Sequence, residues 1–428
     1  MAQVAIQGTQ VPAPGVVADK APVATSALWL EVVSDPQVLA SLAPQWQELA
    51  DGALEPNAFY EPWMALPALR TLESSASGGV QFLLAWAPHP SGRKGERQLC
   101  GLFPVQSRSL GGLLPVRVQA LWRYTYCYLC TPLLRPRVAR EVLELFLDWV
   151  GKSGGTGRLF GGEFLPAQGA FYQLLVDALH RRGWSSFQRE LFTRALLRRA
   201  SSAEQYLELA LAGRRRKELR RLRARLEEQG RLTVEQLQPH QDWRPGVKAF
   251  VALEARSWKG GEGVALGSHP THLRFFEQLA EAAHARGRLE LLALELDGRP
   301  VAMKLNLQSA AGSWAVKIAF DPDFARFSPG VLLEVENINR QHEQGAPGVM
   351  DSCADPSRFM INHLWTERLA MQSLWVATDS LPQSLLLGCL PLAQWARRRL
   401  KARAAARAAA ALPLPSPRSS DAQLTAEA

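Results

Sequence analysis

Three apolar runs in the second half of the chain predict neighbouring strands of one sheet. They cover residues 289–296, 301–308 and 313–320. The first two are separated by Asp297-Gly298-Arg299-Pro300, and an Asp-Gly pair is typical of a tight hairpin because both residues tolerate a positive φ. The third run leads through a short loop to Ser328-Pro329-Gly330, which predicts a helix over 329–344. Because a helix N-terminus that follows a strand is a ready anion site, the pattern indicates a phosphate-bearing ligand.

The rest of the chain alternates between strand-like and helical patterns, and its two halves repeat one order of elements. In the first half, helices are predicted at 35–50, 138–150 and 169–182, and strands at 80–86, 98–108, 116–130, 157–164 and 187–197. In the second half, helices are predicted at 203–229, 243–258 and 270–286, and further strands at 232–237, 349–352 and 372–377. We therefore predict an α/β fold (α+β, mixed sheet) built from two similar units.

Composition and charge divide the chain into four predicted regions. With 47% hydrophobic and 21% charged residues among 428, the chain has a globular composition and is long enough for two cores. We predict a disordered leader at 1–27, one unit at 28–200, a second unit at 201–380, and a basic amphipathic helix with a disordered tail at 381–428. The net charge of +9 has two local sources, because residues 213–231 carry +6 and residues 380–420 carry +7.

The cysteines and the chain ends give predictions about metals and location. Cys127 and Cys130 have the spacing of half a zinc site, but no second pair follows at a suitable distance, so we predict buried thiols and no metal. No apolar run approaches the ~20 residues that a membrane-spanning helix needs. The N-terminus has neither the basic start nor the apolar core of a secretory signal. These features together predict a cytoplasmic protein.

Four segments between residues 213 and 378 resemble one known group of enzymes. They are RRRKELRRLRARLEEQG, LLALELDGRPVAMKLNL, FDPDFARFSPGVLLEVENI and VMDSCADPSRFMINHLWTERL. In order and spacing, these segments resemble the BioF2-like or FemAB-like branch of the GCN5-related N-acetyltransferase (GNAT) superfamily. The resemblance implies two tandem GNAT-like domains, of which the second transfers an acyl group from acyl-CoA to an amine.

The resemblance also implies where acyl-CoA binds. In the superfamily, the cofactor lies between two central strands that splay apart, and its pyrophosphate meets backbone N–H groups in the loop before the next helix. In this chain the implied loop residues are Arg326, Ser328 as helix cap, Gly330 for close approach of the backbone, and Val331. The acyl carbonyl would accept a hydrogen bond from the strand backbone, which stabilises the oxyanion of the tetrahedral intermediate. The strand residues implied are Ile318, Ala319 and Phe320.

Three residues are candidates for proton transfer, which amine acylation requires of its enzyme. Asp351 ends a short apolar strand and opens into a turn, which is typical of a catalytic carboxylate, or else it caps the turn at 352–354. Glu334 lies one turn past Gly330, where it would face the cleft or, as an alternative, a solvated helix surface. His363 would relay protons, since a histidine titrates near neutral pH, or it would be a hydrogen-bonded structural residue.

Three cations are candidates for substrate binding. Lys304 and Lys317 interrupt apolar strands, and strand alternation predicts that both lie on the open face of the sheet near the acyl donor. The alternative is an exposed sheet face without a ligand. Arg368 follows the Asp351 strand at the place where Fem relatives carry a downstream lysine, and this departure argues against the Fem-type role of that lysine.

Two basic segments indicate anionic partners. Leu219, Leu222 and Leu226 recur at helical spacing within 213–231, which predicts an amphipathic helix whose basic face is solvated or attracts CoA, acidic lipid head groups or RNA. No aromatic residue separates its arginines, and this counts against sequence-reading contacts to RNA. Residues 385–411 combine apolar residues, Trp395 and bases, which predicts peripheral contact with an anionic membrane at its inner face, or else a packing helix with a solvated tail.

The expected function is that of an acyl-CoA-dependent N-acyltransferase. Its amine acceptor would be an envelope sugar, an amino acid or a long-chain base, attacked directly in a ternary complex and without a metal. One alternative is a Fem-type aminoacyl-tRNA-dependent transferase, in which the arginine-rich helix would bind tRNA. Another is a catalytically silent, membrane-associated interaction protein, which a loop with Gly330 as its single glycine would suit.

Overall fold

The computed structural model of the protein describes most of the two predicted units. The described residues are 28–73, 79–91, 93, 95–109, 117–152, 159–256, 266–309, 312–343, 348–356 and 359–378, with the single residues 388, 399 and 403. The predicted leader at 1–27 lies outside the described residues, as does the predicted basic helix and tail at 381–428 apart from those three positions.

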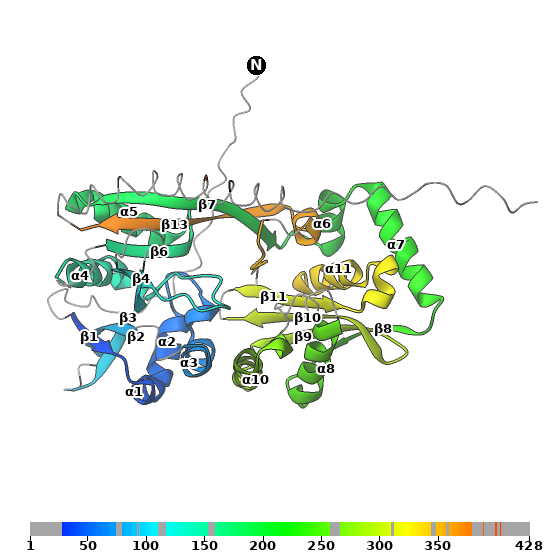
Figure 1. The fold of residues 1–428 in the computed structure, drawn as a ribbon, viewed down its shortest axis with the longest axis horizontal. Helices are drawn as coiled ribbons and strands as arrows, with labels where there is room; N and C mark the ends of the chain where they lie inside the picture. The colour runs from blue at the N-terminus through cyan, green and yellow to red at the C-terminus, as the bar shows by residue number, and fades with distance from the viewer. Residues whose placement is uncertain are drawn as a thin grey trace, which may run out of the picture.

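The strands of both halves join in a single mixed sheet (Figure 1). Those of the first half are β1 Trp29–Val33, β2 Val80–Pro88, β3 Arg97–Ser109, β4 Arg117–Leu121, β5 Leu133–Leu134, β6 Leu159–Pro166 and β7 Ser185–Arg198. Those of the second half are β8 Leu232–Gln236, β9 Leu289–Leu296, β10 Arg299–Gln308, β11 Ser313–Phe320, β12 Val349–Asp351 and β13 Glu367–Ala377. Their order is β1-β2-β3-β4-β6-β13-β7-β12-β11-β10-β9-β8, and β5 pairs with β3.

The helices occupy equivalent places in the two halves. The first half contains α1 Pro36–Ser41, α2 Ala43–Asp51, the 3-10 helix η2 Ala58–Tyr60, α3 Pro62–Thr71, η4 Pro136–Val138, α4 Ala139–Lys152 and α5 Ala170–Arg182. The second half contains α6 Ala203–Ala210, α7 Gly213–Glu227, α8 Trp243–Arg256, η5 Leu266–Ser268, α10 Pro270–His284, η6 Pro322–Phe327, α11 Pro329–Gln341 and α12 Phe359–Leu364. By their place in the order of strands, α1 to α3 correspond to α8 and α10, α4 corresponds to α11, and α5 corresponds to α12. Helices α6 and α7 have no counterpart among the described residues of the first half.

The last strand of each half pairs with the other half. β13 lies between β6 and β7 and pairs antiparallel with both, while β7 pairs with β12. In Figure 1, β7 and β13 run side by side along the top of the molecule from one half to the other. The structure confirms a mixed α/β fold built from two halves with a similar order of elements. Because the exchanged strands tie the halves together, the domain boundaries at 28–200 and 201–380 stay a prediction.

The hairpin predicted from the Asp-Gly pair is present between β9 and β10. Asp297 has φ 48° and Gly298 has φ 76°, the left-handed pair that a two-residue turn requires. The Asp297 carboxylate also accepts a hydrogen bond from the Arg231 backbone N–H at 2.8 Å, and so ties the start of β8 to the turn. The turn that the sequence predicts therefore fixes the β9–β10 hairpin and holds the start of the edge strand β8 beside it.

The strand predicted over 116–130 ends earlier, at Leu121. The residues that follow are irregular, yet Trp122, Tyr124, Cys127 and Cys130 are buried in the core. Their side chains produce a strand-like pattern, but they are buried because the segment packs on first-half residues such as Phe82 and, through Tyr124, on Phe275 of α10. Cys127 and Cys130 are buried as predicted, with sulfur atoms 3.8 Å apart, and burial raises the pKa of the Cys127 thiol.

The two halves share one apolar core. It runs continuously from the first-half strands to Phe275 of α10 and Trp314 of β11, and a second cluster lies among α6, α7 and α11. None of the described helices is both long enough and apolar enough to cross a membrane. Within the described part of the chain, no group of three or more His, Cys, Asp or Glu side chains is placed to hold a metal.

Candidate functional site

β11 and β12 form a fork at the centre of the second half. They run parallel but pair at only two positions, Ser313 with Met350 and Trp314 with Asp351. β11 then continues to Phe320, whereas β12 ends at Asp351. The register of β11 against β10 also shifts next to Val316, which marks a β-bulge, and bulges are frequent beside functional sites. A ligand placed in the fork would therefore meet backbone groups of β11 that β12 leaves unpaired.

The helix that follows β11 begins differently from the predicted cradle. Ser328 is the N-cap residue of α11, as predicted, but it has left-handed dihedral angles (φ 53°, ψ 49°) and its side chain makes no capping bond. Its carbonyl instead accepts hydrogen bonds from the Val331 and Leu332 N–H groups, at 2.9 and 3.1 Å. Pro329 has no N–H, so the Gly330 N–H is the amide of this first turn left without a backbone partner among the described residues.

The two ends of the predicted cradle also differ in exposure. Gly330 is buried, and a Cβ built on it would lie 3.5 Å from Phe320 and 3.9 Å from Ile318, which is ordinary contact. The side chains of Ile318 and Phe320 therefore lie next to the helix start. Arg326 is exposed, with its guanidinium 4.7 Å from the centre of the Phe327 ring. A phosphate that reached this turn would meet one free amide and one solvated cation.

Glu334 does not face a cleft or solvent, and both predicted positions for it were wrong. It is fully buried beneath α11, where its carboxylate accepts hydrogen bonds from Lys304 Nζ at 2.8 Å, Asn337 Nδ2 at 2.9 Å and Trp365 Nε1 at 3.0 Å. Lys304 is buried as well. The reason is that this stripe of α11 packs directly on β10, so the buried pair joins the helix to the sheet.

Lys317 lies on the opposite face of the sheet from Lys304, so the predicted common face was wrong. In the antiparallel pair of β10 and β11, Lys304 stands beside Ile318 whereas Leu305 stands beside Lys317. Since cross-strand partners share a face and successive residues alternate, the register separates the two lysines. Lys317 Nζ donates to Glu254 of α8 at 2.7 Å, and Glu254 accepts the Leu266 N–H at 2.9 Å.

A polar cluster that the sequence analysis missed surrounds Lys317 where the halves meet. We call Tyr126, Glu254, His272 and Lys317 the junction cluster. The Tyr126 hydroxyl lies 3.1 Å from His272 Nδ1, and Lys317 Nζ lies 5.7 Å from the centre of the Tyr126 ring. Tyr126 comes from the irregular segment after β4, and His272 from the first turn of α10. The available signal was the pair His269 and His272, at the start of a predicted helix.

The environment of His272 favours its neutral form. Burial lowers the pKa of His272 below its ordinary value of 6.5, and the charges of His269 and Lys317 lower it further. Burial raises the pKa of Tyr126, so its hydroxyl keeps its proton. At neutral pH the cluster thus holds an uncharged imidazole beside a protonated phenol. The imidazole is in the form that a general base needs.

Asp351 lies at the start of the fork, where an arginine holds its carboxylate. The buried guanidinium of Arg194 forms an ion pair with Asp351 and also donates to the Tyr128 carbonyl at 2.7 Å. The other Asp351 oxygen accepts the Cys353 N–H at 3.0 Å, which is the turn-capping contact expected as the alternative. Burial first, and then Asp351, raise the pKa of the Cys353 thiol.

The remaining predicted residues lie near α12. His363 is exposed in the last turn of this helix. Arg368 is exposed on β13 and donates to the carbonyls of Asn362 and Trp365, each at 2.6 Å, so that it closes the C-terminal end of α12. The structure therefore brings Lys317 to the junction cluster but leaves His363 and Arg368 outside it. The substrate-binding role of Arg368 and the catalytic role of His363 stay predictions.

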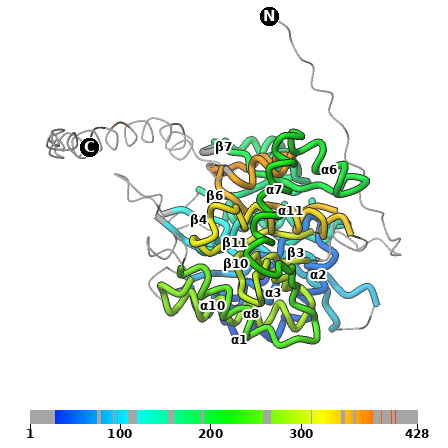
Figure 2. Tube along the Cα trace, turned by 90° about the vertical axis from the view of Figure 1, so that its right-hand side faces the viewer, coloured from blue at the N-terminus to red at the C-terminus, as the bar shows by residue number. Residues whose placement is uncertain are grey.

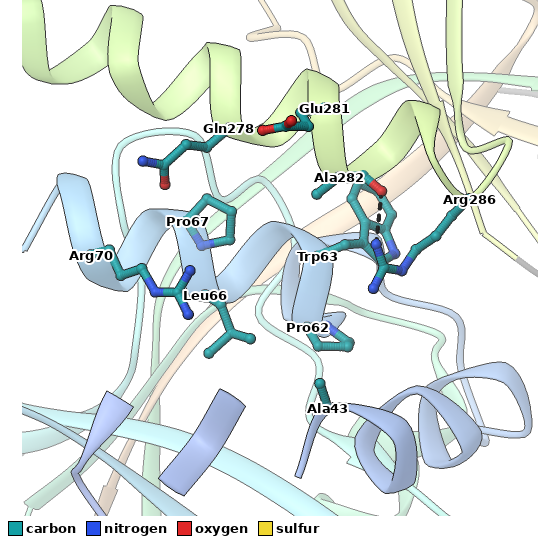
Figure 3. A pocket seen from close by; sticks show the side chains of 10 residues that line it. All are labelled: Ala43, Pro62, Trp63, Leu66, Pro67, Arg70, Gln278, Glu281, Ala282 and Arg286. Atoms are coloured by element: carbon teal, nitrogen blue, oxygen red, sulfur yellow. Dashed lines mark hydrogen bonds between the residues drawn. The ribbon is translucent and has the colours of Figure 1, made fainter. Parts of the chain in front are cut away.

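A hollow of about 360 Å³ lies at another part of the junction, between α3 and α10 (Figure 3). Pro62, Trp63 and Leu66 form its apolar wall, and Arg70 and Glu281 border it. Arg286 is bonded to the Ala282 carbonyl at 3.0 Å. The residues of α10 that line it begin at Gln278, six positions beyond His272, and no residue of the junction cluster lines it, so this hollow is separate from the cluster.

The groups at the fork and at the start of α11 suit an acyl-CoA in their main features. The fork exposes a strand edge, a helix N-terminus follows that strand, and Arg326 offers a positive charge beside it. One difference is that few amides of the first turn are free. Pro329 has no N–H, and the N–H groups of Val331 and Leu332 donate to the Ser328 carbonyl. Arg326 would therefore supply the positive charge that free amides supply at an ordinary helix N-terminus.

The segment that forms the fork also matches a known protein family. Residues 213–359 match the family model of an acetyltransferase (GNAT) domain. Among solved structures, FemX has a similar fold with a TM-score of 0.51 and 12% identity, covering 81% of this chain and 98% of FemX. At this identity the likeness concerns the fold alone. No curated protein matches the chain.

Two further solved structures are similar at lower scores. L-PGS from Bacillus licheniformis has a TM-score of 0.47 and 14% identity, covering 83% of this chain and 96% of its own. A tandem GNAT protein from the clavulanic acid biosynthesis pathway has a TM-score of 0.41 and 13% identity, covering 82% and 98%. Residues 213–359, which include the forked strands and the helix that follows them, therefore match an acetyltransferase (GNAT) domain, and the chain has a fold similar to that of FemX.

Proposed function

We propose that the protein is an acyl-CoA-dependent N-acyltransferase whose reaction takes place between the fork and the junction cluster. The observation that carries the proposal is the position of Lys317. It lies on β11 three residues beyond Trp314, the last residue paired with β12, and points to the face where Tyr126 and His272 meet. A thioester in the fork would thus have an open amine site beside it, with a neutral imidazole within the same cluster.

The donor would lie along β11. Arg326 and the Gly330 N–H would hold its phosphates, and backbone N–H groups of β11 beyond the fork would polarise the thioester carbonyl. We assign the polarising groups to Val316 and Lys317, slightly before the predicted residues 318–320, because β12 pairs with β11 only as far as Trp314.

The acceptor would enter between the two halves. Its ammonium first loses a proton to His272 Nε2, and the amine nitrogen then attacks the thioester carbon. His272 passes this first proton to solvent and takes the second N–H proton from the tetrahedral intermediate. The carbon–sulfur bond breaks as the intermediate collapses, and the departing thiolate takes that second proton from His272. The products are an amide, CoA thiol and one released proton. For Nε2 to accept a proton, Nδ1–H must donate to the Tyr126 oxygen, which lies 3.1 Å away.

The test combines donor binding with thiol release. A thermal melt with CoA, acetyl-CoA and a long-chain acyl-CoA identifies the donor, because a specific ligand raises the melting temperature by mass action. Release of CoA thiol is then followed with an amino sugar, an amino acid and a long-chain amine as acceptors. Stabilisation by one acyl-CoA and turnover with one amine class would support the proposal. A protein that no acyl-CoA stabilises would contradict it.

A second candidate is a Fem-type aminoacyl-tRNA-dependent transferase. The observations that favour it are the fold shared with FemX and the arginine-rich helix α7. This candidate predicts binding of bulk tRNA that weakens steeply with salt, since phosphate contacts release counterions. The same melt with tRNA at low and high salt separates the two donors.

A further inference from the structure

A groove of about 510 Å³ lies between α6, α7 and α11. Figure 2 views this end of the molecule, where α7 runs beside α11 with α6 close by. The groove is on the outer side of α11, because the opposite stripe of this helix, with Glu334 and Asn337, contacts the sheet. α11 thus separates the groove from the sheet face that it covers. Its volume is within the range of about 300 to 1,000 Å³ typical of small-molecule sites.

The floor of the groove is apolar. It is formed by one leucine of α6, the leucine that follows this helix, one leucine of α7, and a leucine and a valine of α11: Leu207, Leu211, Leu219, Leu332 and Val335. No aromatic side chain lines it. An apolar channel of this kind fits a hydrocarbon chain, whereas bases of a nucleic acid would need stacking partners.

The rim of the groove is cationic. Arg216, Arg220 and Arg223 line it, against the single carboxylate of Glu204. Arg223 is held by Glu227 and Glu336, and Arg216 by Glu208. Among the described residues, the partly exposed Arg216 donates to Glu208 through Nη1 alone, and the exposed Arg220 has no ion-pair partner. Two guanidinium groups at the rim can therefore donate to an anion.

The rim carries three guanidinium groups against one carboxylate, which favours an anionic occupant. The chain's own segment at 380–420 is a poor occupant, since it carries seven bases and no acid.

We propose that the groove of α6, α7 and α11 binds an anionic lipid at a membrane surface. An acyl chain would lie on the leucine floor, and the phosphate would meet Arg216 and Arg220. This lipid site is independent of the acyl-transfer proposal, because it uses neither the fork nor the junction cluster.

The test is co-sedimentation of the full chain with vesicles of phosphatidylcholine alone or mixed equally with phosphatidylglycerol. The double variant Arg216→Ser/Arg220→Ser should lower affinity for the mixed vesicles about 25-fold, since each basic residue near the surface contributes about fivefold. Leu207→Asn, on the groove floor, should also weaken binding. Arg274→Ser on α10 and Val38→Asn on α1 are matched controls that should bind as the wild type, with unchanged melting temperatures.

A second experiment distinguishes binding of a whole lipid from binding of its phosphate alone. Monomeric short-chain phosphatidylglycerol should raise the melting temperature of the wild type but not of the double variant, and inorganic phosphate should raise neither. The proposal is overturned if the groove variants bind vesicles as the wild type does, which would assign binding to the basic tail. It is also overturned if phosphate alone stabilises equally, or if the arginine changes abolish binding of bulk tRNA and leave vesicle binding intact.

Discussion

At the scale of single residues, the chemistry depends on how the junction cluster sets the state of His272. Its imidazole is partly buried, lies near the Lys317 ammonium and shares a hydrogen bond with Tyr126. Each of the first two features disfavours a second proton on the ring. The third orients the ring, and a base that is neutral and oriented requires no rearrangement before it accepts a proton.

Replacing His272 by alanine should lower kcat about 100- to 10,000-fold, the usual contribution of a general base. The protein should still fold, because His272 is only partly buried. His269→Ala is the matched control, since this exposed neighbour lies in the same turn and makes no contact with Tyr126 in the described structure. Equal activity of the two variants would remove His272 from the mechanism.

The pH profile provides an independent check. Because burial lowers the pKa of His272, kcat/KM should rise with pH through a midpoint below 6.5 and then level off. The imidazole accepts a proton only after losing its own, so activity is lost as pH falls. A further rise at higher pH would report deprotonation of the acceptor amine. The low-pH limb should be absent from the residual activity of His272→Ala.

At the scale of elements, α11 is attached to the sheet by a buried charge pair. Glu334→Ala should lower the free energy of unfolding by about 3–5 kcal/mol, because it leaves the Lys304 ammonium buried without a partner. The double change Lys304→Met/Glu334→Leu should recover most of this loss. Urea denaturation of the three proteins measures it. A stable but inactive Glu334→Ala would instead support the catalytic role predicted from the sequence.

The start of the fork depends on a second buried pair. Asp351→Asn removes the charge opposite Arg194 and should cost about 3–5 kcal/mol of unfolding free energy, since the guanidinium has almost no contact with water. Activity should be normalised to folded protein, measured by circular dichroism. If Asp351 only positions the fork, the normalised activity falls far less than in His272→Ala. A comparable fall would support the predicted role as a base.

At the scale of the whole molecule, exchange of β7 and β13 makes the two halves interdependent. Fragments 28–200 and 201–380 produced separately should fail to fold, because β13 of the second half forms ladders with both β6 and β7 of the first. Co-expressed fragments should copurify as a folded complex. Cooperative melting of either fragment alone would show that the exchange is not needed for folding, and this would support the predicted boundaries as independent domains.

Much of the second half could be predicted from the sequence because its signals are local. The Asp297-Gly298 turn, the apolar runs on either side of it and the proline at the start of α11 are all neighbours along the chain. The candidate site was predicted less well. Lys317 was identified but placed on the wrong face, since one register step in β11 decides the face and the bulge beside Val316 has no sequence signature.

The sequence by itself determined the order of elements, the hairpin, the location of the basic segments and the resemblance to GNAT enzymes, because turns, apolar periodicity and charge runs involve residues close together in the chain. Only the tertiary structure decided that Glu334 is buried, that Arg194 holds Asp351, and that Tyr126 meets His272 across 146 positions. These contacts arise from packing between distant segments, and no local pattern encodes which side chains the shared core and the exchanged strands bring together.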